Sequence, residues 1–159
     1  MHKATLMLSL ALISVISIAA QAAEVSRSVT VTASPEQVWE VIGPFCAIGD
    51  WYPGITSCEE QTTDGTTYRQ LTTADGGHFL EKLLQHDDGG MSYSYAIEEG
   101  SLPVSDYSST MSVTESAGDT VITWQSTFEP DGASEAEAVE VVTGVYDGGL
   151  EALRQRFAE

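Results

Sequence analysis

The stretch "SVTVTASPEQVWEVIGPFCAIGDWYPGI" (residues 28–55) contains a strand, a helix start and two helix breaks. Apolar and polar residues alternate through 24–33, which predicts a strand with one buried face. Ser34-Pro35 then predicts a helix start, because serine caps free amide groups and proline suits the first helical position. Gly43-Pro44 and Pro53-Gly54 end two short helices, since proline lacks an amide donor. The stretch therefore predicts a strand followed by two short helices.

From residue 55 onward the apolar period changes to two, and turn residues recur about every ten positions. These signals predict six further strands, at 55–63, 66–74, 78–87, 91–98, 105–116 and 119–129. Short turns join consecutive strands, so the strands are expected to form an antiparallel meander.

A long helix is predicted at the end of the chain, from the cap Ser134 to about Phe157. One apolar stripe recurs along it at steps of three and four residues: Val139, Val142, Tyr146, Leu150, Leu153 and Phe157. A helix with a single apolar stripe covers one apolar face of a sheet.

The predicted order is strand, two short helices, six strands and one long helix, which indicates an α+β fold. A curved antiparallel sheet of about seven strands would have one apolar face, and the long helix is the element that can cover it. The two short helices would close one end of the space between them. Their aromatic side chains would form a wedge there: Trp39, Phe45, Trp51 and Tyr52.

The N-terminus has the three parts of a secretory signal peptide: a basic start, an apolar run and small residues before a cleavage site. Lys3 is followed by an apolar run to Ala20, and Ala20-Gln21-Ala22 fits the cleavage pattern. We expect a signal peptide at 1–22, one mature domain at 23–159, and secretion or a periplasmic location. A retained membrane anchor is the alternative.

The chain is strongly acidic, with 6 Lys+Arg against 24 Asp+Glu and a formal net charge of −18. Phosphate backbones and anionic membrane surfaces would repel such a protein, so we expect no nucleic-acid partner and no membrane partner after signal cleavage. The acidic residues are spread along the chain, which indicates a solvated surface in preference to an acidic docking face.

The two cysteines, Cys46 and Cys58, both lie in the part of the chain expected to leave the cytoplasm. Outside the cytoplasm such a pair forms a disulfide more readily than a redox or metal site. His78 and His86 lack further ligands at a metal-binding spacing, so no metal is expected. The motifs of serine hydrolases, zinc proteases, nucleotide enzymes and dinucleotide enzymes are absent from the sequence, and no cofactor is expected.

The element order and four motifs together resemble the START-like helix-grip superfamily (SRPBCC), and within it the secreted proteins similar to polyketide cyclases and dehydrases. The motifs are S-P-x-x-V-W, the helix pair "FCAIGDWYPGI", "LPV" before Tyr107, and the final helix. The resemblance covers the whole mature chain. It implies a helix-grip fold whose internal cavity accepts an apolar or aromatic small molecule without a cofactor. It specifies the activity less closely, because the superfamily includes lipid carriers, hormone receptors, aromatases and cyclases.

A more distant resemblance, to plant abscisic-acid receptors, implies positions for several pocket residues. It places Glu81 at a pocket glutamate, Tyr107 at a pocket tyrosine and Gln125 at the position of a second glutamate. Tyr95 falls at an inward position, and Leu102-Pro103 falls in the gating loop. The lysine that holds the ligand carboxylate in those receptors is replaced here by Thr56, so the resemblance implies no anionic ligand anchored in that way.

Glu81 is the candidate for chemistry, because alternation places it on the same face as Phe79 and Leu83. A carboxylate on an apolar wall can serve as an acid, a base or a hydrogen-bond partner. At a sheet edge, Glu81 and Lys82 would both reach water instead. The expected ligand-binding residues are Trp51, Tyr68, Glu81, Tyr95, Leu102, Tyr107, Gln125, Val142 and Tyr146. Trp124, opposite in alternation to Gln125, is expected to be structural.

Three functions remain open at this point. The first is a secreted binder of a hydrophobic or aromatic small molecule, lipid-like or polyketide-like. The second is a cofactor-free enzyme of cyclase or dehydratase type, with Glu81 as the acid or base. The third is an interaction module with a filled core and no ligand.

Overall fold

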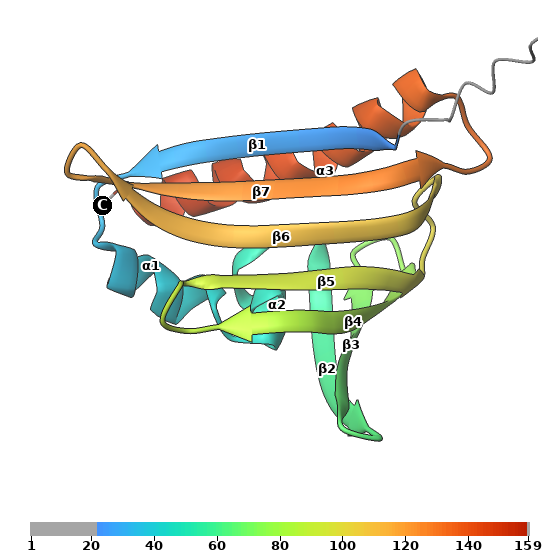
Figure 1. The fold of residues 1–159 in the computed structure, drawn as a ribbon, viewed down its shortest axis with the longest axis horizontal. Coiled ribbons are helices and arrows are strands. Elements are labelled where there is room, and N and C mark those ends of the chain that lie inside the picture. The colour runs from blue at the N-terminus through green and yellow to red at the C-terminus, as the bar shows by residue number, and fades with distance from the viewer. Residues whose placement is uncertain (1–21, 159) are drawn as a thin grey trace, which may run out of the picture.

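The computed structural model describes residues 22–158, so the expected signal peptide, apart from its last residue, lies outside the described residues. The chain has one strand, three short helical segments, six strands and one long helix (Figure 1). The elements are β1 (Ala23–Val31), α1 (Pro35–Ile42), the 3₁₀ helix η1 (Phe45–Ala47), α2 (Ile48–Trp51), β2 (Ile55–Thr63), β3 (Thr66–Thr73), β4 (His78–Asp87), β5 (Ser92–Glu99), β6 (Val104–Ser116), β7 (Asp119–Pro130) and α3 (Glu135–Arg156).

All seven strands form one antiparallel sheet in the order β1-β7-β6-β5-β4-β3-β2. The strands β2 to β7 form the predicted meander, and β1 pairs with β7 at the edge opposite to β2. The segment from α1 to α2 therefore carries the chain from one edge of the sheet to the other. The α+β helix-grip fold expected from the sequence is confirmed.

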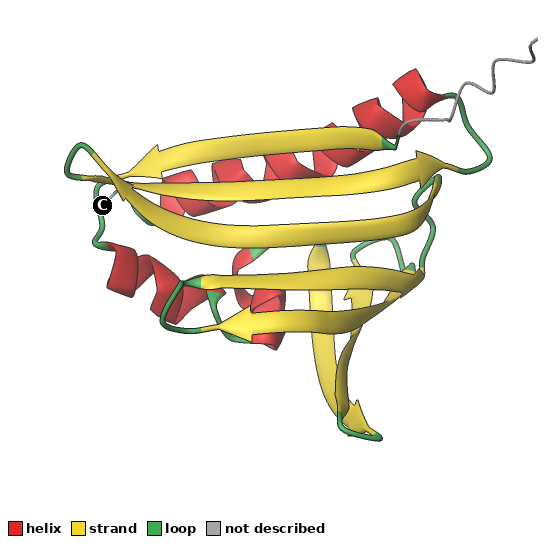
Figure 2. Cartoon of the chain, in the orientation of Figure 1, coloured by secondary structure: helices red, strands yellow, loops and turns green. Residues whose placement is uncertain are grey.

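The helix α3 lies against one face of the sheet and contacts β1 and β7, as Figure 2 shows. Its buried side chains follow the predicted stripe: Val142, Tyr146 and Leu153 are fully buried, and Leu150 is nearly so. They pack on the inward residues of the sheet, such as Ile122 and Phe128. None of the helices described between residues 22 and 158 is both long and apolar enough to span a bilayer.

Both principal helices begin with the serine cap that the sequence predicted. Ser34 and Gln37 form a reciprocal capping box at α1, and Ser134 and Glu137 form another at α3. Each box satisfies backbone amide groups that the first turn leaves without a partner. These local signals fix where the long helix starts.

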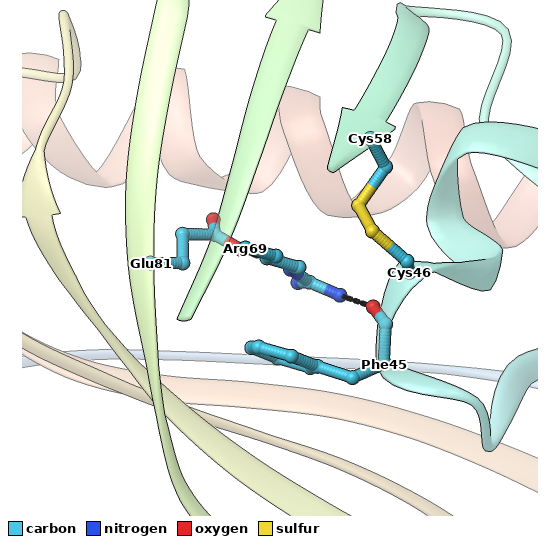
Figure 3. The surroundings of a disulfide bond; sticks show 5 residues. All are labelled: Phe45, Cys46, Cys58, Arg69 and Glu81. Atoms are coloured by element: carbon cyan, nitrogen blue, oxygen red, sulfur yellow. Dashed lines mark hydrogen bonds and ion pairs between the residues drawn. A yellow bond between two sulfur atoms is a disulfide. The ribbon is translucent and has the colours of Figure 1, made fainter. Parts of the chain in front are cut away.

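The aromatic wedge also has its expected position. Trp39, Phe45 and Trp51 are buried, and Tyr52 is partly buried against them. The predicted disulfide is present, because Cys46 of η1 and Cys58 of β2 are bonded. Figure 3 shows that this bond joins the short helical segment to the neighbouring strand. The wedge is thus held to the edge of the sheet by a covalent bond.

Candidate functional site

A cavity of about 390 Å³ lies between the inner face of the sheet, α2 and α3. Its exposed lining residues lie in the β3–β4 turn (Ala74 and Asp75) and in the loop before β6 (Ser101), so the cavity opens to solvent there. Most of its lining is apolar or aromatic. The lining residues are Ile48, Tyr52, Gly54, Ile55, Leu71, Thr73, Ala74, Asp75, Phe79, Glu81, Tyr95, Ile97, Ser101, Leu102, Tyr107, Trp124 and Val145.

Four of the expected ligand-binding residues line this cavity, each from a different element. Glu81 comes from β4, Tyr95 from β5, Leu102 from the loop after β5, and Tyr107 from β6. The alternation of side chains along the strands places the first two, because both lie on the buried face. The sheet thus brings together residues that are far apart in the sequence.

Three other expected residues are buried in the core and do not line the cavity. Trp51 packs edge-on against Trp124, with ring centroids 5.9 Å apart. Val142 and Tyr146 lie fully buried on α3. The structure therefore does not bring these three expected residues to the cavity.

The structure also does not bring Tyr68 and Gln125 to the cavity. On β3 the buried residues are Arg69 and Leu71, so alternation turns Tyr68 to the other face of the sheet. On β7, Gln125 is exposed between the buried residues Trp124 and Ser126. Neither residue lines the cavity. Trp124, which we expected to be structural only, does line it.

The most unusual feature of the site is a buried ion pair between Arg69 and Glu81. Arg69 Nε donates to Glu81 Oε2 at 2.6 Å, and the Arg69 side chain has no exposed surface. A second guanidinium nitrogen, Nη1, donates to the backbone carbonyl of Phe45 (Figure 3). The guanidinium also lies 4.1 Å from the centre of the Phe45 ring and 4.8 Å from that of Tyr95. Arg69 therefore links β3, β4 and η1.

The two charges of this pair support each other. Burial raises the pKa of the Glu81 carboxyl, and the neighbouring Arg69 guanidinium opposes that rise. Burial lowers the pKa of Arg69, but the charge of Glu81 and the hydrogen bond to it raise that pKa above its ordinary value. Protonating Glu81 would leave a buried guanidinium without a counter-charge, which is costly. The pair therefore favours a carboxylate at the cavity wall.

Sequence reasoning did not single out Arg69, although the sequence contains the signal for it. The residues Arg69 and Glu81 are equally distant from Asp75, in the turn that joins β3 to β4. A hairpin centred on that turn pairs them directly, and this is the observed register. Once this pairing of β3 with β4 is assumed, the sequence predicts that Arg69 lies opposite Glu81.

Hydrogen bonds fix the aromatic wall of the cavity. Trp124 Nε1 donates to Tyr95 Oη at 3.1 Å and to Ser109 Oγ at 3.0 Å. The hydroxyls of Tyr107 and Tyr146 are hydrogen-bonded to each other. Burial raises the pKa of both Tyr95 and Tyr107 well above the ordinary value. These hydroxyls are therefore neutral at physiological pH.

A glycine in α3 allows this wall to form. A Cβ atom on Gly149 would lie 2.6 Å from Tyr52 Cδ2 and 2.8 Å from a ring carbon of Trp124. Both rings can approach the helix backbone only because residue 149 has no side chain. Tyr52 Oη also donates to the carbonyl of Val145 on the same helix, at 3.1 Å.

The mouth of the cavity is formed by two short loops. Asp75, in the β3–β4 turn, accepts hydrogen bonds from Thr73 Oγ1 and from the amide of Gly77. On the other side, the Leu102 carbonyl accepts a hydrogen bond from the amide of Val104. Within residues 22–158, no group of three or more His, Cys, Asp or Glu side chains is arranged to hold a metal ion.

Comparison with known proteins agrees with this architecture. The sequence matches the family described as polyketide cyclase / dehydrase and lipid transport over residues 22–158. A search of curated proteins found no match.

Two solved Bacillus proteins are similar in sequence as well as in fold. The protein XoxI from Bacillus cereus is 36% identical, with a TM-score of 0.80 over 86% of this chain and 96% of that one. An uncharacterised protein from Bacillus thuringiensis is 35% identical, with the same TM-score over 86% of this chain and 100% of that one. The Zhui aromatase/cyclase from Streptomyces sp. R1128 is 19% identical, with a TM-score of 0.69 over 87% and 94% of the chains, and shares the fold.

Proposed function

The chain belongs to the polyketide cyclase/dehydrase and lipid transport family, with the START-like helix-grip fold, and from this premise we propose that it binds a hydrophobic or aromatic small molecule. The observation that carries the proposal is the mostly apolar cavity of about 390 Å³. Its volume lies within the range of small-molecule sites, roughly 300 to 1,000 Å³. Affinity would come from apolar burial, at about 25 cal/mol for each Å² removed from water.

The polar groups of the lining would orient the ligand. The Glu81 carboxylate offers an acceptor, and the neutral hydroxyls of Tyr95 and Tyr107 offer donors and acceptors. A few polar groups in an apolar cavity are the usual basis of orientation and specificity.

We also propose that the protein acts outside the cytoplasm. The support is the signal-peptide pattern at 1–22 together with the Cys46–Cys58 disulfide. Disulfides form and persist in oxidising compartments.

A cofactor-free cyclase or dehydratase activity is a second candidate, and one observation favours it. Glu81 lines the cavity close to Tyr95, as an acid or base and a hydroxyl would in proton transfer next to a carbonyl. The variant Glu81→Gln discriminates the two, provided that thermal unfolding shows it to be folded. A binder of a neutral ligand would keep most of its affinity, whereas an acid/base enzyme would lose turnover with binding largely intact. The third alternative, an interaction module with a filled core, is the one that the cavity supports least.

The experiment that tests the proposal is native mass spectrometry of protein purified from its own host, followed by identification of any extracted compound. A stoichiometric apolar or aromatic compound is expected. A protein that is empty and takes up no hydrophobic dye would contradict the proposal.

A matched pair of variants locates the binding. Ala74 is exposed and lines the cavity, so Ala74→Trp should block its mouth and reduce dye uptake. Gln70 is exposed on the opposite face of β3, and Gln70→Trp should leave uptake unchanged. Equal uptake by both variants would place the dye outside this cavity.

A further inference from the structure

The ionisable groups of the cavity have a marked charge asymmetry. Glu81 and Asp75 contribute carboxylates, whereas no lysine, arginine or histidine of residues 22–158 lines the cavity. The other polar side chains of the lining are hydroxyls and the Trp124 indole, whose N–H is already donated within the wall. An anionic ligand would leave water without meeting any cation, which costs free energy.

The arrangement of the ion pair places the carboxylate, and not the guanidinium, at the cavity wall. Arg69 uses Nε for Glu81 Oε2 and Nη1 for the Phe45 carbonyl, and its Nη2 has no hydrogen-bond partner among the described residues. Its side chain has no exposed surface and is not part of the cavity lining. Glu81 lines the cavity, its side chain is only 7% exposed, and Oε1 receives no hydrogen bond from the described residues. A ligand in the cavity therefore meets a carboxylate oxygen that accepts no hydrogen bond from the described residues, while the buried guanidinium behind it offsets part of its charge.

The aromatic side chains of the lining provide a second favourable environment for positive charge. Five aromatic side chains border the cavity: Tyr52, Phe79, Tyr95, Tyr107 and Trp124. Aromatic rings attract an ammonium group placed over their faces, most strongly where water is excluded. Since burial keeps the Tyr95 and Tyr107 hydroxyls neutral, these rings remain uncharged partners.

The charge of the whole protein acts in the same direction. With 24 acidic residues against 6 Lys+Arg, the formal net charge is −18. A negative field raises the local concentration of cations and accelerates their association, and salt weakens it.

We propose that the ligand is an organic cation, an apolar or aromatic body with a protonated or quaternary amine that hydrogen-bonds or pairs with Glu81 among the aromatic rings. The proposal rests on the proposed function and specifies its ligand class. It predicts a preference for amines over neutral and anionic molecules of the same skeleton.

Three probes with one carbon skeleton test this preference: 2-naphthylmethylamine, 2-naphthylmethanol and 2-naphthoate. Isothermal titration calorimetry at pH 7 and low salt would give each Kd for the wild-type protein. We expect the amine to bind about tenfold more tightly than the alcohol, and the carboxylate to bind most weakly. The advantage of the amine should shrink as salt is added.

The outcomes separate this proposal from the proposed function. Binding of the alcohol or the carboxylate at least as tightly as the amine overturns the cation preference and leaves hydrophobic binding intact. No binding by any of the three probes, together with no dye uptake, overturns both.

A variant at the mouth gives an independent test without disturbing the buried pair. Asp75 is exposed, so Asp75→Asn should keep the fold while it removes one carboxylate. We expect about threefold weaker amine binding and unchanged alcohol binding. Asp64→Asn, at the distant tip of the β2–β3 hairpin, is the matched control and should change neither Kd. Equal effects of the two variants on amine binding would overturn a local role for the cavity carboxylates.

Discussion

Arg69 and Glu81 face each other directly across β3 and β4 and form an ion pair of 2.6 Å whose guanidinium is wholly buried. The pair lies between the cavity and the disulfide-linked segment η1, because Arg69 also donates to the Phe45 carbonyl. A change to Glu81 at the cavity wall is therefore expected to change the stability of the fold as well. A buried pair of this kind is costly to break on one side and much less costly to replace as a whole.

The first prediction follows from this difference between breaking the pair and replacing it. Arg69→Met or Glu81→Leu alone should lower the free energy of unfolding by about 3–5 kcal/mol, because each leaves a buried charge unpaired. The double variant should recover most of the loss. Urea denaturation of the four proteins measures the coupling as a double-mutant cycle. Strictly additive losses would show that the pair does not act as a unit.

The second prediction concerns two glycines of α3. Gly149→Ala should destabilise the protein by about 1–3 kcal/mol, because the new Cβ overlaps the rings of Tyr52 and Trp124. Gly144 is exposed, and a Cβ atom on it would have no neighbouring atom within 4 Å. Gly144→Ala should therefore stabilise the helix by up to about 1 kcal/mol. Thermal unfolding of both variants tests whether the two substitutions change the stability in opposite directions.

Equal effects of the two alanine substitutions would contradict the close approach at Gly149. A further readout is available there, because Tyr52 and Trp124 line the cavity. Gly149→Ala should also weaken dye uptake, whereas Gly144→Ala should leave uptake unchanged.

The fold was largely predictable from the sequence because local signals and periodicity agree. The Ser34 and Ser134 caps start their helices as predicted, and the turns that separate the strands fix the meander. Because the apolar stripe of α3 must be buried, the helix is expected to cover the apolar inner face of the sheet. Family resemblance added the expectation of a cavity between them.

The site was less predictable, since it depends on strand alternation and on pairing across the sheet. Gln125 and Tyr68 were assigned to the cavity by resemblance and by residue type, but alternation turns both to the other face. Arg69 was missed because a basic residue on a strand is usually solvated. Its burial depends on Glu81 twelve residues later and on the Phe45 carbonyl, neither of which local pattern reveals.

The third prediction concerns the disulfide. Removing both cysteines as Cys46→Ala/Cys58→Ala should lower the free energy of unfolding by about 2–4 kcal/mol, because the closed loop no longer restricts the unfolded chain. Reductant should lower the wild-type Tm to about that of the variant, and should leave the Tm of the variant unchanged. If thiol labelling shows that the wild-type disulfide is fully reduced and the Tm is unchanged, the disulfide does not stabilise the fold.

The fourth prediction is a pH dependence from the C-terminal half of α3. Hydrogen bonds from Arg154 and Gln155 lower the pKa of Glu151 from 4.5 to about 2. A carboxylate with a lowered pKa stabilises the folded state above its unfolded pKa, and the contribution is lost as the pH falls through the folded pKa. The contribution of Glu151 should therefore disappear between about pH 4.5 and about pH 2.

Urea denaturation at pH 6 and at pH 2.5 measures this loss in wild type and in Glu151→Gln. Acid also neutralises the other carboxylates, so the informative quantity is the difference between the two proteins, in which shared effects cancel. The loss of stability on acidification should be smaller in Glu151→Gln than in wild type. Glu140→Gln is the control, because Glu140 lies exposed on the same helix and makes no side-chain hydrogen bond to the described residues. If Glu151→Gln loses as much stability as wild type and the control, the Arg154 and Gln155 hydrogen bonds contribute nothing in solution.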